Sequence, residues 1–266
     1  MIDIAICLIS GAVLGFLIGL TGVGGGVLTV PILILIMRLE PIAAVGTASL
    51  YSVLTKIYAV YRHYRQETIN WHVGLKFLIA ALPGMLCTST LVELSKASIS
   101  PDGVAALQNG ISYLIILSIG FSFVVLLFDF RHFENRFFTS SFGKVLSVCC
   151  AFLVGAVMGA TSIGGGILII PALLLFYRET SKYVGTSLFT AVFLMLAMSA
   201  IYAFLGQNGQ LGDIDLRVAG FMALGSLVGT HYGSGFSMKI DTKWLQRVVI
   251  GVIILAALMM FADKLI

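Results

Sequence analysis

The sequence has very little charge for its length. Of its 266 residues, 11% are Asp, Glu, Lys or Arg, whereas 59% are hydrophobic and the mean hydropathy is +1.06. Such a chain has too few charged side chains to cover a surface that faces water. The composition therefore excludes a soluble globular protein and indicates an integral membrane protein.

Other features are scarce as well. The N-terminus, Met1-Ile2-Asp3-Ile4, has no basic stretch before its apolar run, so we read it as mature structure rather than a signal peptide. The net charge is +4, but no basic cluster is interleaved with aromatic residues, so we expect no binding of nucleic acid. The four cysteines lack C-x-x-C or histidine spacing, so we expect buried thiols, no metal site and no cofactor.

Several separate apolar segments are long enough to cross a bilayer. A transmembrane helix needs about 20 apolar residues. We expect simple spans near 42–61, 72–92 and 183–205, further spans ending near 128, 236 and 262, and a polar stretch from Glu93 to Asn109. The chain is therefore predicted to be an all-α polytopic membrane protein in contact with the lipid bilayer.

Two apolar runs are interrupted by the same glycine-rich pattern. The first is Thr21-Gly22-Val23-Gly24-Gly25-Gly26 followed by Pro31, and the second is Thr161-Ser162-Ile163-Gly164-Gly165-Gly166 followed by Pro171. Val45-Gly46-Thr47 matches Val184-Gly185-Thr186, and Ile69-Asn70-Trp71 resembles Ile214-Asp215-Leu216. Internal duplication is typical of transporters whose site lies between two repeats. We expect a first repeat at 1–128, a cytoplasmic connecting loop at 129–144 and a second repeat at 145–266.

The charges of the loops predict the topology. The loops at 62–70, 129–144, 178–182 and 239–243 are basic, whereas 206–215 contains Asp213 and Asp215 and no Lys or Arg. The positive-inside rule then fits every loop only if each glycine-broken segment enters the membrane and returns as a re-entrant helical hairpin. Each repeat has one hairpin and three transmembrane helices, the two repeats are inverted, and both termini lie outside the cytoplasm.

The glycine breaks are also the predicted binding site. A helix that restarts after a break presents free backbone N–H groups and the positive end of its dipole, which suit an anion. No Asp or Glu is expected in the middle of a span, so the carboxylate relay usual in cation and proton pumps is missing. Both observations favour a small anionic substrate, although glycines in membrane helices also serve packing alone.

The predicted substrate-binding residues come from both breaks and both Val-Gly-Thr elements. They are Thr21, Gly24, Gly25, Gly26, Thr47, Thr161, Ser162, Gly164, Gly165, Gly166 and Thr186, with Lys56, Ser49 and Ser187 as accessory candidates. The sequence leaves alternatives open for some of them. Lys56 can instead extend towards the membrane interface, and Ser and Thr hydroxyls can bond to their own helix.

With these paired glycine stretches and Val-Gly-Thr elements, the sequence resembles the TauE/SafE (sulfite exporter, TSUP) family of membrane transporters over essentially its whole length. The resemblance implies transport of small sulfur-containing or organic anions, such as sulfite, thiosulfate or sulfoacetate, across the bacterial inner membrane. The two copies differ at Ala48-Ser49, where the second has Ser187-Leu188, so the hydroxyl groups are not placed symmetrically.

Two functions of other classes are also open to this sequence. One is an intramembrane enzyme that uses Ser234 and His231, but Gly233-Ser234-Gly235 is not a full Gly-x-Ser-x-Gly motif and lacks an orienting carboxylate. The other is an accessory subunit without transport activity, which would not require two polar breaks in the membrane. We expect a transporter without catalytic residues. The substrate, direction, coupling ion and oligomeric state do not follow from the sequence.

Overall fold

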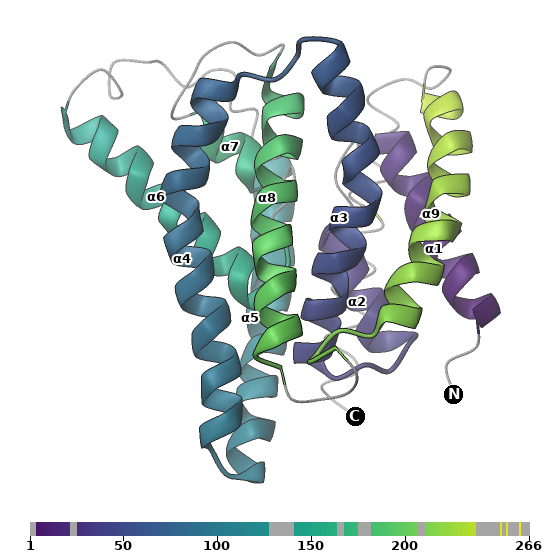
Figure 1. The fold of residues 1–266 in the computed structure, drawn as a ribbon, viewed down its shortest axis with the longest axis vertical. Helices are drawn as coiled ribbons and strands as arrows, with labels where there is room; N and C mark the ends of the chain where they lie inside the picture. Colours follow the sequence, from purple (N-terminus) through teal and green to yellow (C-terminus); the bar gives the residue numbers. More distant parts are fainter. Residues whose placement is uncertain are drawn as a thin grey trace.

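We analysed a computed structural model of the chain. The structure describes residues 4–21, 26–127, 141–163, 168–174, 182–206 and 211–237, together with residues 251, 254 and 261. Across these residues the chain forms α-helices and turns and has no β-strand (Figure 1). The all-helical prediction is therefore confirmed for the part of the chain that is described.

The helices follow the predicted spans closely. They are α1 (Ile4–Thr21), α2 (Gly26–Leu35), α3 (Pro41–Arg65), α4 (Trp71–Ser98), α5 (Pro101–Leu127), α6 (Ser141–Thr161), α7 (Ile169–Leu174), α8 (Tyr183–Phe204) and α9 (Leu216–Ser237). Four of the described segments, in α3, α4, α5 and α8, are long and apolar enough to cross a membrane, and α1 and α6 contain shorter apolar stretches. The span predicted to end near 262 falls mostly outside the described residues.

Helices α4 and α5 extend beyond their predicted spans. The polar stretch expected from Glu93 onwards is helical, because α4 continues to Ser98 and α5 begins at Pro101. Pro101 is suited to the first position of a helix, and Asp102 follows it in the first turn, where negative charge is favourable. The 28 residues of α4 make a helix of about 42 Å, longer than the about 30 Å of hydrocarbon in a bilayer. The joined ends of α4 and α5 project below the other helices (Figure 1).

The tightest helix packing joins elements from opposite halves of the chain. The most extensive contacts are those of α1 with α9 and of α4 with α6. A Cβ atom on Gly15 of α1 would overlap the carbonyl group of Ser226 in α9, and one on Gly155 of α6 would overlap that of Ala81 in α4. Small residues allow such close approach of helix backbones. Gly15 and Gly155 therefore serve close helix contact in these two pairs.

Matching helices of the two halves run in opposite directions. Helices α3 and α8 pack against each other at the centre of the molecule. The connection from α3 to α4 lies at the top of the view, whereas that from α8 to α9 lies at the bottom (Figure 1). Helices α1 and α3 both begin at the lower end, and α6 and α8 both begin at the upper end. Helices α2 and α7 pack against α3 and α8, respectively.

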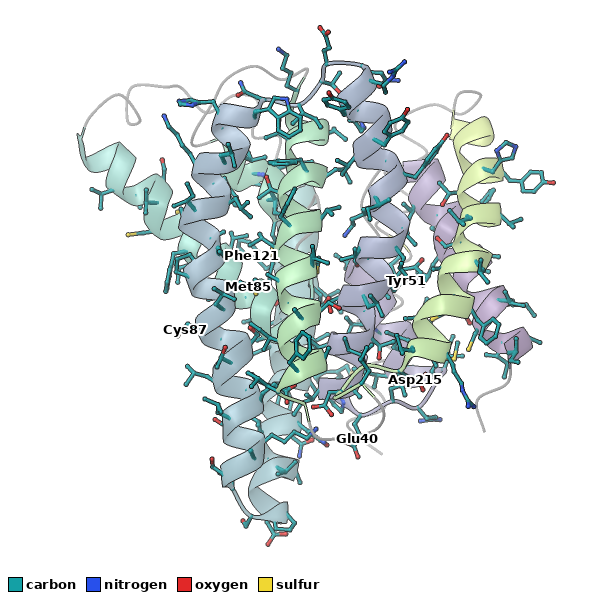
Figure 2. All side chains as sticks on the ribbon, in the orientation of Figure 1. Glu40, Tyr51, Met85, Cys87, Phe121 and Asp215 are labelled. Atoms are coloured by element: carbon teal, nitrogen blue, oxygen red, sulfur yellow. The ribbon has the colours of Figure 1, made fainter. Side chains whose placement is uncertain are left out.

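The cysteines correct one prediction. Cys7 is buried, but Cys87 and Cys149 are exposed and Cys150 is partly exposed, and all four are free thiols. Cys87 lies on the outer side of α4 (Figure 2). The prediction of buried thiols holds only for Cys7, because an apolar sequence neighbourhood does not distinguish a side chain facing lipid from one in the protein core.

Candidate functional site

Both predicted glycine breaks fall between two helices. Helix α1 ends at Thr21 and α2 begins at Gly26, while α6 ends at Thr161 and α7 begins at Ile169. Gly24, Gly25, Gly164, Gly165 and Gly166 lie outside the described residues, as does the side chain of Thr21. The residues that enter the second break are described, and they show how α6 ends.

Ser162, which follows the last residue of α6, has left-handed backbone geometry. Ser162 has a φ of 55°, which is uncommon for a residue other than glycine, and its N–H donates to the carbonyl of Met158 at 2.8 Å. The hydroxyl of Thr161 donates to the carbonyl of Val157 at 2.7 Å and accepts from the N–H of Ile163 at 3.2 Å. Thr161 therefore stabilises the end of the helix, and its donor is already in use.

The hydroxyl of Ser162 has only a weak hydrogen-bond acceptor among the described residues. The side chain is fully buried and donates to the thioether sulfur of Met195 at 3.6 Å. A thioether is a poor hydrogen-bond acceptor compared with an oxyanion. Of the described hydroxyl groups in the predicted site, that of Ser162 is the one best placed to donate to a bound anion.

Thr47 and Thr186 have matching roles in helix capping. The Thr47 hydroxyl accepts from the backbone N–H of Asp215 at 3.0 Å, and the Thr186 hydroxyl accepts from that of Asn70 at 2.9 Å. Asp215 and Asn70 in turn accept, through side-chain oxygens, from backbone N–H groups in the first turns of α9 and α4. Each threonine therefore holds the N-cap of a helix that belongs to the other half of the chain.

The glycine before each of these threonines allows the close approach. A Cβ atom on Gly46 would lie 2.8 Å from the carbonyl oxygen of Asp213, and one on Gly185 would lie 2.5 Å from that of Thr68. The hydroxyls of the accessory candidates Ser49 and Ser187 bond to carbonyls within their own helices, at 2.6 Å and 2.9 Å. The Val-Gly-Thr elements thus bring helix starts together, and the four side chains already have hydrogen-bond partners.

Lys56 of α3 is a buried cation. Its side chain is 5% exposed, and its Nζ atom is buried with no hydrogen-bond partner among the described residues. A lysine that extends to the interface would keep its ammonium group in contact with water, so the structure argues against that alternative. The buried residues Ser49 and Ser52 lie on the same stripe of α3, seven and four residues before Lys56. An ammonium group without a partner in this setting is suited to an anionic ligand.

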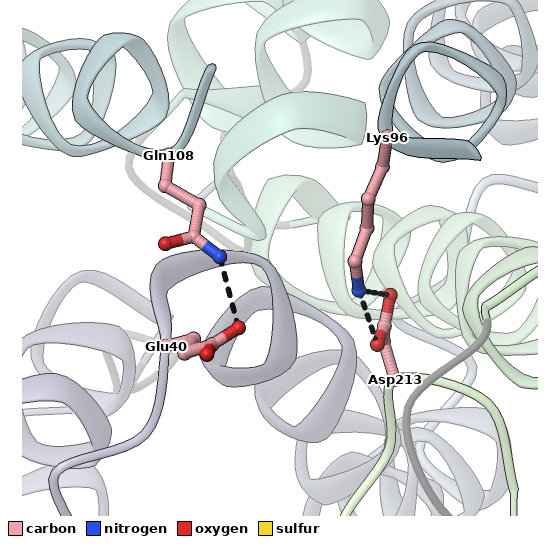
Figure 3. Close-up of polar contacts among 4 residues, drawn as sticks. All are labelled: Glu40, Lys96, Gln108 and Asp213. Atoms are coloured by element: carbon pink, nitrogen blue, oxygen red, sulfur yellow. Dashed lines mark hydrogen bonds and ion pairs between the residues drawn. The ribbon is translucent and has the colours of Figure 1, made fainter. Parts of the chain in front are cut away.

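A second group of buried charges was not predicted. Lys96 near the end of α4 donates to both carboxylate oxygens of Asp213, at 2.7 Å and 2.6 Å (Figure 3). Asp213 is fully buried at its side chain, and Glu93, one turn before Lys96 on α4, is 2% exposed. The prediction of no Asp or Glu concerned the middle of the spans, and these carboxylates are buried instead near the end of α4 and in the turn before α9. The i, i+3 spacing of Glu93 and Lys96 was visible in the sequence, but a helix at this polar stretch was not expected.

These observations define an α-helical membrane protein with polar and charged groups enclosed between its helices. The model of a family described as "Sulfite exporter TauE/SafE" matches residues 7–260. The chain belongs to this family, and its general function is transport across a membrane.

Relatives described as membrane transporters cover almost the whole chain. "Probable membrane transporter protein YjnA" of Bacillus subtilis (strain 168) is 30% identical over 255 residues, which cover 94% of this chain and 97% of that protein. A "Probable membrane transporter protein" of Haemophilus influenzae is 26% identical over 90% of this chain and 88% of its own length. "Probable membrane transporter protein YunE" of B. subtilis is 24% identical over 94% of both chains. No solved structure matches the chain.

Proposed function

We propose that this protein transports a small anion that binds between the two glycine-rich breaks, with the ammonium group of Lys56 as its counter-charge. The observation that carries the proposal is the burial of Lys56 without a hydrogen-bond partner among the described residues. A buried charge is costly unless it is paired. The bound anion supplies the missing pair, and the cost of burying the free ammonium group favours anion binding.

The internal match between the halves relates Lys56 to the first break. Lys56 follows Thr47 by nine residues, and Met195 follows Thr186 by the same number. Met195 contacts the hydroxyl of Ser162 at the start of the second break. By analogy, we propose that Lys56 faces the first break, which includes Gly24, Gly25 and Gly26. The site then joins a cation from one half to a weakly bonded hydroxyl group, that of Ser162, from the other.

We also propose the topology that such a site requires. The opposite directions of α3 and α8, and the packing of α2 against α3 and of α7 against α8, support two inverted repeats that each begin with a re-entrant hairpin. Anion movement follows from alternate opening of this central site to the two sides. In a bacterium, the protein would lie in the inner membrane, with the termini outside the cytoplasm.

The proposed substrates are oxyanions of sulfur, namely sulfite, thiosulfate or organosulfonates. The name of the family and the backbone N–H donors expected at the glycine breaks both support this choice. The enzyme alternative rests on Ser234, whose side chain lies outside the described residues, and on His231, which is exposed. Neither observation favours an enzyme over a transporter.

The test is anion binding by the purified protein, measured as thermal stabilisation, followed by flux in proteoliposomes. Wild-type protein should be stabilised by one or more of sulfite, thiosulfate and a sulfonate, and should carry that anion across the liposome membrane. A Gly25→Val, Gly165→Val double variant should stay folded but lose the stabilisation. Absence of binding and flux for the whole set of anions would refute the proposal, and full affinity in the folded double variant would remove the breaks from the site.

A further inference from the structure

Glu93, Lys96 and Asp213 form a buried cluster with an odd charge balance. When all three groups are ionised, two negative charges face one positive charge. Lys96 uses its ammonium group to bridge both oxygens of Asp213, and neither oxygen of Glu93 has a hydrogen-bond partner among the described residues. Glu93 is therefore the group that the cluster leaves without compensation.

A proton would complete this arrangement. Two ionised carboxylates have no hydrogen to share, so they cannot bond to each other. Lys96 lies one turn after Glu93 on α4 and bonds to Asp213, so the two carboxyl groups are held near the same ammonium group, and a proton on one of them would allow a direct interaction. One proton would also leave the cluster neutral, with one carboxylate balanced by Lys96. The arrangement of two buried carboxyl groups beside a single ammonium group therefore suits a pair that holds one proton.

The cluster also lies where protonation can affect movement. Glu93 and Lys96 belong to α4 in the first half, whereas Asp213 belongs to the turn that leads into α9 in the second half. The backbone N–H of Asp213 donates to the carbonyl of Tyr202 at the end of α8. Lys96 and Asp213 therefore join α4 to the connection between α8 and α9 (Figure 3).

We propose that the Glu93–Asp213 pair is a proton-binding site that couples proton movement to transport. With the proton bound, the pair holds α4 against the 211–215 turn and closes this end of the transporter. Release of the proton leaves an uncompensated buried carboxylate, which favours separation of the two elements and entry of water. The proton site itself is independent of the anion site, but its coupling to flux rests on the proposed transport function.

Other ionisable groups lie on the helices packed around the cluster. Tyr202 of α8 lies near both carboxyl groups and donates its hydroxyl hydrogen to the carbonyl of Gly159 in α6. Helices α5 and α6 also pack against α4, and the turn carrying Asp213 lies against Gly46 of α3. Among the described residues, α3 carries the ionisable side chains Tyr51, Lys56, Tyr58, Tyr61, His63, Tyr64 and Arg65, and Glu40 directly precedes it. Helix α5 carries Asp102 and Tyr113, and α6 carries Cys149 and Cys150. The charges that act on Glu93 are those of Asp213 and Lys96.

Infrared spectroscopy tests the proton site without any substrate. The carbonyl stretch of a protonated buried carboxyl group should be present near neutral pH in the purified wild-type protein and disappear as the pH is raised. It should be lost in Glu93→Gln. It should also be lost in Asp213→Asn, because a single carboxylate is balanced by Lys96, so the test does not depend on one variant folding.

Glu40→Gln is the matched control. Glu40 lies at the same end of the molecule but is exposed and accepts a hydrogen bond from Gln108 at 2.9 Å (Figure 3). Its replacement should leave the band unchanged. A wild-type protein without the band, or a band that persists at full intensity in both Glu93→Gln and Asp213→Asn, would overturn the assignment.

The coupling is tested in proteoliposomes that contain a pH-sensitive dye. Thiosulfate is the probe, since it is fully ionised near neutral pH and carries no proton itself. Thiosulfate flux through the wild type and Glu40→Gln should be accompanied by a change of internal pH, and this change should be abolished in Glu93→Gln. Flux that requires sodium and moves no protons would refute the coupling. An infrared band without flux of thiosulfate, sulfite or sulfonate would instead refute the proposed anion transport and leave the proton site standing.

Discussion

Replacement of Lys56 by methionine should make the protein more stable and less able to bind anions. A lysine near the middle of a membrane helix costs about 2.5 to 3.5 kcal/mol, and Lys56 is buried without a hydrogen-bond partner among the described residues. Methionine has a similar unbranched shape and occupies the matching position, Met195, where it is fully buried. Lys56→Met should therefore stabilise the anion-free protein by about 3 kcal/mol, which corresponds to a rise of roughly 6 to 12 °C in Tm.

The measurement is thermal unfolding in detergent, with and without the anion that stabilises the wild type. Lys56→Met should unfold at a higher temperature than the wild type without anion and should gain nothing when the anion is added. Lys76→Met is the matched control, because Lys76 is an exposed lysine of α4, and its Tm and anion response should both stay close to those of the wild type. A Lys56→Met protein that unfolds at a lower temperature and still responds to the anion would show that the ammonium group has a structural partner and is not part of the site.

Three further predictions follow from the packing, the caps and the topology. Gly15→Leu should separate α1 from α9 and lower the free energy of unfolding by about 1 to 3 kcal/mol or more, which would be detected as a loss of monodisperse protein. Gly110→Leu is the control and should have little effect, because nothing lies within 4 Å of an added Cβ there. Thr47→Val should lower the free energy of unfolding by about 1 to 3 kcal/mol, because the backbone N–H of Asp215 loses its acceptor. Thr47→Ser keeps the hydroxyl group and should restore the wild-type free energy of unfolding in the same denaturation assay. In a cysteine-free background, Glu67→Cys should react with an impermeant thiol reagent added on the cytoplasmic side, and Asp102→Cys should react with the reagent added on the outer side. Labelling of both cysteines from the same side would contradict the topology.

The helices were largely predictable because each depends on local sequence. Spans such as α8 show a long apolar run bounded by polar residues, and the end of α8 at Phe204 lies one residue from its predicted position. The polar ends of α4 and α5 were not predictable from hydropathy, because a helix that leaves the hydrocarbon no longer needs apolar residues. Helix α4 continues to Ser98 through residues that favour helix formation, and α5 begins soon afterwards at Pro101. A search for apolar membrane spans does not use these features.

The candidate site was predictable only in part. The duplicated motifs located the residues that matter, but they did not distinguish a ligand from a structural partner, as the caps held by Thr47 and Thr186 show. The pairing of Lys96 with Asp213 joins residues 117 positions apart. A sequence without the three-dimensional arrangement gives no reason to place an acidic loop against a lysine so distant along the chain.

Contacts that join helices of one half to helices of the other determine which parts of the molecule can move as rigid bodies. The glycine-mediated contacts tie α1 to α9 and α4 to α6, and the threonine hydroxyls tie α3 to the start of α9 and α8 to the start of α4. A rocking motion that preserved these contacts would carry α1, α3 and α9 together against α4, α6 and α8. Its hinges would then lie in the connections from α3 to α4 and from α8 to α9, within each half of the chain, rather than in the segment that joins the two halves.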